Sequence, residues 1–167
     1  QCLQGEPQRH VDSLILTASG GPFVGKKRGG LKNIQVKDAL NHPNWEMGAK
    51  ITIDSASLMN KGLEVIEAMW LFDISAKNID VVVHRQSIIH SAVRFIDGSI
   101  IAQLGYPDMK LPIHYALSFP QRQPSNLKKF NFLEYPNLSF EEPDYKTFKN
   151  LSLAFLAAKK GGSVPCV

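Results

Sequence analysis

The polar residues best suited to chemistry lie in the stretch from Ile51 to Trp70. Asn60, Lys61 and Glu64 have spacings that place them on one side of a helix, near its start. An amide and an ammonium group donate hydrogen bonds to oxyanions, and a carboxylate is a hard ligand for a divalent metal. The same pattern is also typical of a solvated face with a Lys–Glu pair, worth about a few tenths of a kcal/mol. Spacing alone leaves both interpretations open.

The elements that position these side chains begin with a predicted strand end. Ile51 and Ile53 are β-branched and precede Asp54 and Ser55, so we expect a strand followed by a hydroxyl-rich turn. From about Ser57 the spacing becomes helical, and one apolar stripe is predicted to face the core: Met59, Leu63, Ile66 and Trp70.

The rest of the chain alternates short apolar runs with amphipathic segments. Asp97-Gly98 between two β-rich runs predicts a hairpin. His84 and His90 lie on predicted strands, where histidines more often satisfy hydrogen bonds than bind ligands. Strands are predicted at 13–18, 80–84, 87–95 and 99–104, and helices at 33–41, 108–118 and 147–160.

Composition limits the classes of protein and partner. The chain has 167 residues, 44% of them hydrophobic, and a net charge of +4. This mild, dispersed excess of basic residues does not predict nucleic-acid binding, and no apolar run is long enough to span a membrane. Cys2 and Cys166 show neither metal spacing nor a disulfide framework. The chain starts at Gln1 and trails off after a helix, so we expect a piece of a longer protein.

A glycine-rich segment follows the first predicted strand. Gly20 and Gly21 permit positive φ or a close approach of the backbone. The segment 20–27 nearly matches the phosphate loop G-x-x-x-x-G-K-[ST]. Lys27 stands where the magnesium-binding hydroxyl belongs, and Arg28-Gly29-Gly30 does not open a helix, so the sequence argues against a nucleotide hydrolase.

The segment His42–Gly48 is an unusual loop because it places large apolar side chains between a proline and a glycine. Trp45 and Met47 on a loop tip are typical of a flap that closes over a ligand. The alternative is that both side chains pack back on the core.

Five segments together resemble one family, the 1-deoxy-D-xylulose-5-phosphate reductoisomerases. The resemblance runs from Leu14 to the end and rests on SGGPF at 19–23, HPNWEMG at 42–48, DSASLMNKGLEVIEA at 54–68, HRQSIIHS at 84–91 and LGYPDMKLPI at 104–113. It implies an α+β catalytic domain with a small, mostly antiparallel or mixed sheet and helices packed on one face. That domain would span 1–120, incomplete at its N-terminus, and 121–167 would be a linker and the start of a C-terminal helical region.

The resemblance also implies a reaction. Family members isomerise and reduce 1-deoxy-D-xylulose 5-phosphate to 2-C-methyl-D-erythritol 4-phosphate, using NADPH and Mn²⁺ or Mg²⁺, with Co²⁺ as a further option. They act as homodimers on a phosphosugar, in the bacterial cytoplasm or in plastids. The dinucleotide-binding domain and an acidic D-S-E motif, which supplies the other metal ligands, lie upstream in the family. We therefore expect the 167-residue chain alone to be inactive.

The resemblance assigns roles to individual residues. Glu64 and His42 are the expected catalytic residues, with Glu64 as metal ligand. Glu67, one helical turn on, is expected to orient partners or tune the local charge. The substrate-binding residues are Ser19, His42, Ser55, Asn60, Lys61 and Glu64; the lid residues are Trp45 and Met47; and the NADPH-contacting residues are Gly48 and Met109.

Two functions of other classes remain open on the sequence. One is a stand-alone phosphosugar-binding module without redox chemistry, which an upstream dinucleotide-binding domain would exclude. The other is an interaction domain in which a strand such as 87–95 pairs with a partner chain.

Overall fold

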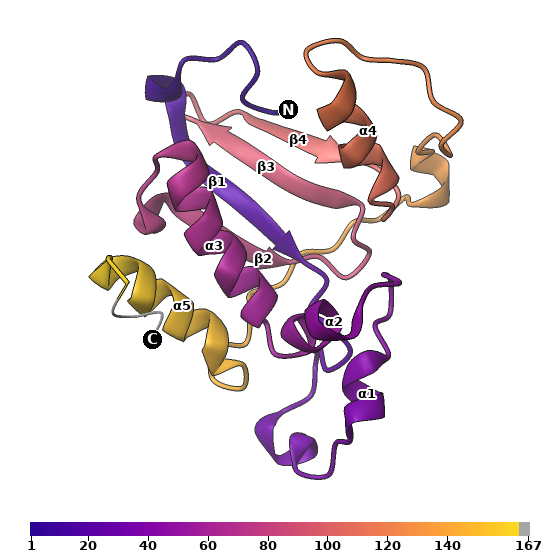
Figure 1. Cartoon of the computed structure of the whole chain (residues 1–167), viewed down its shortest axis with the longest axis vertical. Coiled ribbons are helices and arrows are strands. Elements are labelled where there is room, and N and C mark those ends of the chain that lie inside the picture. The colour runs from indigo at the N-terminus through magenta and orange to yellow at the C-terminus, as the bar shows by residue number, and fades with distance from the viewer. Residues whose placement is uncertain (164–167) are drawn as a thin grey trace.

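A four-stranded mixed sheet forms the centre of the chain in the computed structural model, which describes residues 1–163 (Figure 1). The strand order is β2-β1-β3-β4. β1 runs parallel to β2 and antiparallel to β3, and β3 is antiparallel to β4. The α+β class and the mixed sheet are confirmed. The strands are β1 (Val11–Ala18), β2 (Ile79–Val83), β3 (Ile89–Phe95) and β4 (Ile100–Leu104).

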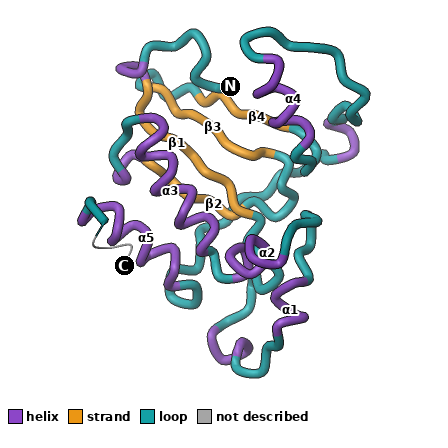
Figure 2. The backbone as a smooth tube through the Cα atoms, viewed as in Figure 1, coloured by secondary structure: helices purple, strands orange, loops and turns teal. Residues whose placement is uncertain are grey.

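The helices lie mainly between β1 and β2 in the chain. α3 crosses one face of the sheet, and α5 lies alongside α3 (Figure 1). The helices are α1 (Val36–Leu40), α2 (Ala49–Ala56), α3 (Met59–Phe72), α4 (Lys110–Ser118) and α5 (Lys149–Lys160). Figure 2 shows the helices in purple around the orange strands. Within residues 1–163, none of the helices has the length and apolar character needed to cross a bilayer.

The β3–β4 hairpin forms as the sequence predicts. Gly98 has φ +86°, and its N–H donates to the Phe95 carbonyl at 2.9 Å. The Asp97 carboxylate accepts from the Ser99 backbone N–H at 2.9 Å. These contacts close the turn and set the register that continues to Arg94 opposite Ile100.

The predicted strand at Ile51–Ile53 is wrong, because these residues lie in helix α2. Gly48 is the N-cap, and the Thr52 hydroxyl donates to the Gly48 carbonyl at 2.9 Å. Thr52 and Ala56 form the buried side of the helix. Ile51 and Ile53 are 39% and 43% exposed, so their β-branched side chains do not decide the local structure.

The predicted core stripe of α3 is also wrong. The residues of α3 that are buried are Gly62, Val65 and Ala68, whereas Leu63 is 40% exposed and Trp70 is 77% exposed. A Cβ placed on Gly62 would lie 2.6 Å from the Ala154 Cβ of α5. The core side of α3 therefore consists partly of small residues, because α5 approaches it closely.

Candidate active site

A cavity of about 580 Å³ lies beside the C-terminal end of β1. β1 and β3, the start of α3, the loop after α1 and the start of α4 all contribute residues to its lining. The structure thus brings together segments far apart in the chain. The predicted site residues that line the cavity are Ser19, His42, Trp45, Met47, Ser55, Asn60, Lys61, Glu64 and Met109.

Ser19 and Ser55 reach the cavity because β1 ends against helix α2. Gly21 has φ +68°, and a Cβ there would lie 2.6 Å from the Ser55 carbonyl oxygen. Only glycine allows the backbone to turn this closely against the last turn of α2. The predicted positive φ at Gly20 and Gly21 is confirmed, and the close approach is to the helix that carries Ser55.

His42 is held in one tautomer by its neighbours. Its Nδ1 accepts from the backbone N–H groups of Asn44 at 3.1 Å and Trp45 at 3.0 Å. Nδ1 is therefore unprotonated, and Nε2–H donates to the Ser19 hydroxyl at 2.9 Å. Burial lowers the pKa of His42. His42 is thus a neutral donor whose N–H is directed at the end of β1.

The two apolar residues of the loop line the cavity. Trp45 packs edge-to-face on His90, with ring centroids 5.8 Å apart. Met47 also contributes to the lining, and both side chains are half-buried. Gly48 is the N-cap of α2 and lies outside the lining. The loop therefore presents its large side chains to the cavity.

The first turns of α3 supply the charged groups. The Asn60 side chain donates to one Glu64 carboxylate oxygen at 2.7 Å, and the Lys61 ammonium donates to the other. The side chain of Lys61 is only 11% exposed. The N-terminal turn of a helix favours anions, because its backbone N–H groups are unpaired and the helix dipole is positive there. Glu67 is exposed and outside the lining.

The donor set fits a divalent metal only in part. Glu64 offers one carboxylate in the cavity, and Mg²⁺ commonly uses one or two protein carboxylates together with water and substrate oxygens. In the described part of the chain, no three His, Cys, Asp or Glu side chains gather closely enough to hold a metal ion. Glu64 therefore fits as one ligand of a larger set.

The two histidines predicted on strands make hydrogen bonds, as the sequence predicts, although His84 lies just after β2 and only His90 lies on a strand, β3. His84 is fully buried, donates from Nδ1 to the Ser139 carbonyl at 2.9 Å, and accepts the Ile88 N–H at 3.1 Å. The His90 ring contacts the Gly105 carbonyl through Nε2 at 3.1 Å, and burial is the main cause that lowers its pKa. His90 also lines the cavity, which spacing did not predict.

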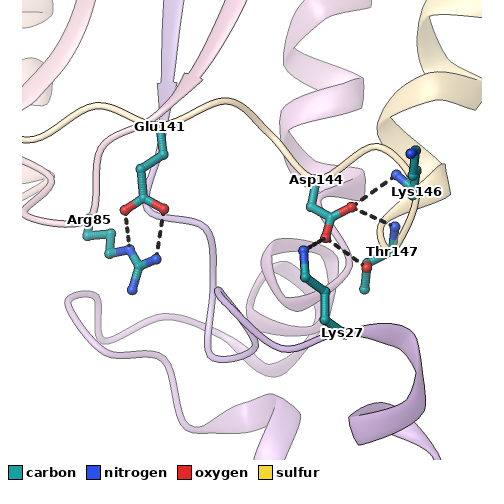
Figure 3. A network of polar contacts seen from close by, with 6 residues as sticks. All are labelled: Lys27, Arg85, Glu141, Asp144, Lys146 and Thr147. Atoms are coloured by element: carbon teal, nitrogen blue, oxygen red, sulfur yellow. Dashed lines mark hydrogen bonds and ion pairs between the residues drawn. The ribbon is translucent and has the colours of Figure 1, made fainter.

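The glycine-rich segment is not a phosphate loop. A short 3₁₀ helix, Arg28–Leu31, follows it in place of an α-helix. Lys27 pairs with Asp144 at 3.0 Å (Figure 3). Hydrogen bonds from Thr147 and Lys27 lower the pKa of Asp144 to about 2. The ammonium of Lys27 therefore pairs with a carboxylate of the same chain, where a phosphate loop would direct its lysine at a phosphate.

Comparison with known proteins gives matches along the whole chain. The family model described as the 1-deoxy-D-xylulose 5-phosphate reductoisomerase C-terminal domain matches residues 1–72, and the DXP reductoisomerase C-terminal domain model matches 104–167. The reductoisomerase of Lachnospira eligens is 56% identical over 99% of this chain and 43% of its own length. That of Thermoanaerobacter sp. strain X514 is 60% identical over 100% of this chain and 44% of its own length.

Solved structures agree with these matches. A DOX-P reductoisomerase in complex with NADPH, fosmidomycin and magnesium superposes with a TM-score of 0.90 at 48% identity, over 93% of this chain and 38% of that one. The Zymomonas mobilis enzyme in complex with NADPH gives 0.90 at 42% identity, over 99% of this chain and 42% of that one. The chain spans less than half the length of the curated relatives it matches. With a shared fold and high identity along its whole length, the chain belongs to the 1-deoxy-D-xylulose 5-phosphate reductoisomerase family.

Proposed function

We propose that the protein containing this chain converts 1-deoxy-D-xylulose 5-phosphate to 2-C-methyl-D-erythritol 4-phosphate in isoprenoid biosynthesis, with NADPH as reductant. The observation that supports this most is the meeting of phosphate donors and Glu64 in one cavity. The identity to named reductoisomerases supports the reaction class.

The phosphate end of the substrate would lie at the start of α3. A phosphate dianion accepts hydrogen bonds only, and the cavity offers hydroxyl, imidazole, amide and ammonium donors. The neutral His42 suits this role, because its Nε2 already carries a proton and its Nδ1 is occupied by backbone donors. We therefore assign His42 to substrate binding rather than to proton abstraction. The binding residues are Ser19, His42, Ser55, Asn60 and Lys61.

Glu64 would face the reacting end of the sugar. A bound divalent ion, Mg²⁺ or Mn²⁺ with Co²⁺ as a further option, would polarise the substrate's carbonyl oxygen as a Lewis acid. Asn60 and Lys61 hold the carboxylate of Glu64 by its two oxygens, so its orientation in the cavity is set before any ligand arrives.

Two further groups of residues are assigned to covering the substrate and to contacting NADPH. Trp45 and Met47 would cover the substrate and exclude water from it. Met109 lies next to the start of α4 and lines the cavity, where its polarisable side chain suits packing on the nicotinamide ring. Gly48, outside the lining, is proposed as a backbone contact to NADPH.

The larger organisation is also a proposal. The domain division stays a proposal: a catalytic domain of residues 1–120, and 121–167 as a linker and the start of a C-terminal helical region, whose helix α5 packs against α3 of the first part. β4 is an edge strand with Ile100 and Ile101 about half exposed, which supports a homodimer. The relatives named above are bacterial, which favours the bacterial cytoplasm over the plastid.

An assay of the full-length gene product tests the reaction. With substrate, NADPH and Mn²⁺, we expect one NADPH consumed for each 2-C-methyl-D-erythritol 4-phosphate formed, and no turnover after chelation of the metal. Phosphosugar binding without NADPH consumption would favour the stand-alone binding module. Ligand-independent strand pairing with no phosphosugar binding would favour the interaction domain.

A further inference from the structure

The loop that carries His42 and Trp45 is attached to a distant segment by one side chain, Asn44. Its amide Nδ2 donates to the Arg85 carbonyl and to the Ser87 hydroxyl, the latter at 3.1 Å. Both acceptors belong to the connection between β2 and β3. The contact therefore joins the loop His42–Gly48, called the lid loop below, to a segment about forty residues further along the chain.

The β2–β3 connection is fixed by contacts that do not involve Asn44. The buried His84 ring holds Ser139 on one side and the Ile88 N–H on the other. The Arg85 guanidinium pairs with both Glu141 carboxylate oxygens at 2.7 and 2.8 Å (Figure 3). Val83 and Glu141 exchange two backbone hydrogen bonds at 2.8 and 2.9 Å. The connection is thus a rigid platform for the loop.

Fixing Asn44 also fixes its neighbours in the loop. The backbone N–H groups of Asn44 and Trp45 both donate to Nδ1 of His42, so the three residues form one hydrogen-bonded turn. The His42 ring then reaches Ser19, and the Trp45 indole rests against His90. A displacement of Asn44 would move both side chains in the cavity.

We propose that Asn44 is a positioning residue, whose amide docks the lid loop on the β2–β3 connection and thereby places His42 and Trp45 in the cavity. The effect on catalysis rests on the proposed function, whereas the effect on Trp45 does not. An Asn→Asp change is the sharpest variant, because the isosteric carboxylate cannot donate and would face the Arg85 carbonyl.

The test follows Trp45 in the full-length gene product labelled with 5-fluorotryptophan. The Trp45 fluorine resonance is assigned by its loss in Trp45→Phe. In Asn44→Asp we expect this resonance to move towards the position of solvent-exposed fluorotryptophan. Ser87→Ala removes one of the two acceptors, so a smaller shift in the same direction is expected. If Asn44→Asp does not fold, the resonance in Ser87→Ala tests the role of Asn44. Asn41→Asp is the matched control, because it adds the same charge on an exposed side chain of the same loop and should leave the resonance in place.

Kinetics supply the second measurement. Asn44→Asp should raise KM for the phosphosugar about tenfold while kcat changes less, because the loop supplies binding contacts. A Trp45 resonance at the parent position in both Asn44→Asp and Ser87→Ala overturns the proposal. A displaced resonance with unchanged KM in an active enzyme also overturns it. If the parent enzyme has no reductoisomerase activity, the proposed function fails, and the Trp45 resonance still decides the role of Asn44.

Discussion

Lys61 is the cavity residue best suited to bind a phosphate, because its side chain is charged, nearly buried and directed into the cavity. It lies in the first turn of α3, is nearly buried, and faces the cavity with its ammonium on Glu64. The amino-acid sequence predicted this residue from helical spacing and from the MNKGLE segment. It did not predict Asn44, because an asparagine after His-Pro has many local uses, and only the fold shows that its amide reaches Arg85 and Ser87.

Lys61→Ala should chiefly raise KM for the phosphosugar. Loss of one charge-assisted contact costs about 1.5–3 kcal/mol, which is roughly a 10- to 150-fold rise in KM. We expect a smaller fall in kcat, because Asn60 still holds one oxygen of Glu64. Steady-state kinetics of the full-length gene product measures this. Lys50→Ala is the control, because Lys50 is exposed, pairs with Asp54 on α2 and lies outside the cavity lining. An equal rise in KM for both variants would contradict the assignment.

Two partly buried histidines, His42 and His90, predict how stability depends on pH. Burial lowers the pKa of His42 and His90 below the ordinary value of 6.5, to which both groups return on unfolding. Below pH 6.5 the unfolded chain binds more protons than the folded chain, so the free energy of unfolding falls as the pH drops. Above pH 6.5 both states are neutral at these groups, and the free energy of unfolding keeps its full value. Urea denaturation at about pH 7 and about pH 5.5 measures the difference. The double variant His42→Asn, His90→Asn should lose less stability over this interval, and an unchanged loss would contradict the explanation.

At the scale of elements, the sequence predicted the strands and α5 well but missed helix α2, whose residues it assigned to a strand end and a turn. Alternating and β-branched runs form strands at β1, β2 and β3 because part of each is buried in the sheet, and β4 forms at the edge because it pairs with β3 across the Asp97-Gly98 turn. The same signal failed at Ile51 and Ile53, where the capped turn at Gly48 and the burial of Thr52 outweigh β-propensity. The core side of α3 was missed because packing against α5 requires small residues, which hydrophobic periodicity does not weigh.

The contact between α3 and α5 gives a prediction about packing. Gly62→Ala raises helix propensity, yet its Cβ would meet the Ala154 Cβ at 2.6 Å. We expect the free energy of unfolding to fall by about 1–3 kcal/mol, because overpacking forces the helices apart. Urea denaturation measures it. Ala154→Gly should recover part of the loss in the double variant, and a stabilising Gly62→Ala would show that the helices are not packed this tightly.

At the scale of the whole molecule, the sheet serves to bring four segments to one cavity. β1 delivers Ser19, the loop after α1 delivers His42 and Trp45, α3 delivers Glu64, and α4 brings Met109. Sequence motifs pointed to nearly all of these residues, but they could not show that side chains from distant segments line one cavity. Their convergence depends on the parallel β1–β2 crossover through α3 and on the close turn at Gly21.

We propose that this cavity is a metal-dependent catalytic site, and a matched pair of variants tests that proposal most directly. Glu64 lines the cavity, whereas Glu67, one turn away on α3, is exposed outside it. In the full-length gene product at saturating Mn²⁺, Glu64→Gln should lower kcat by roughly 100-fold or more with the fold intact. Glu67→Gln should stay within about twofold of the parent. Near-normal turnover in Glu64→Gln, or equal losses in both variants, would contradict the account.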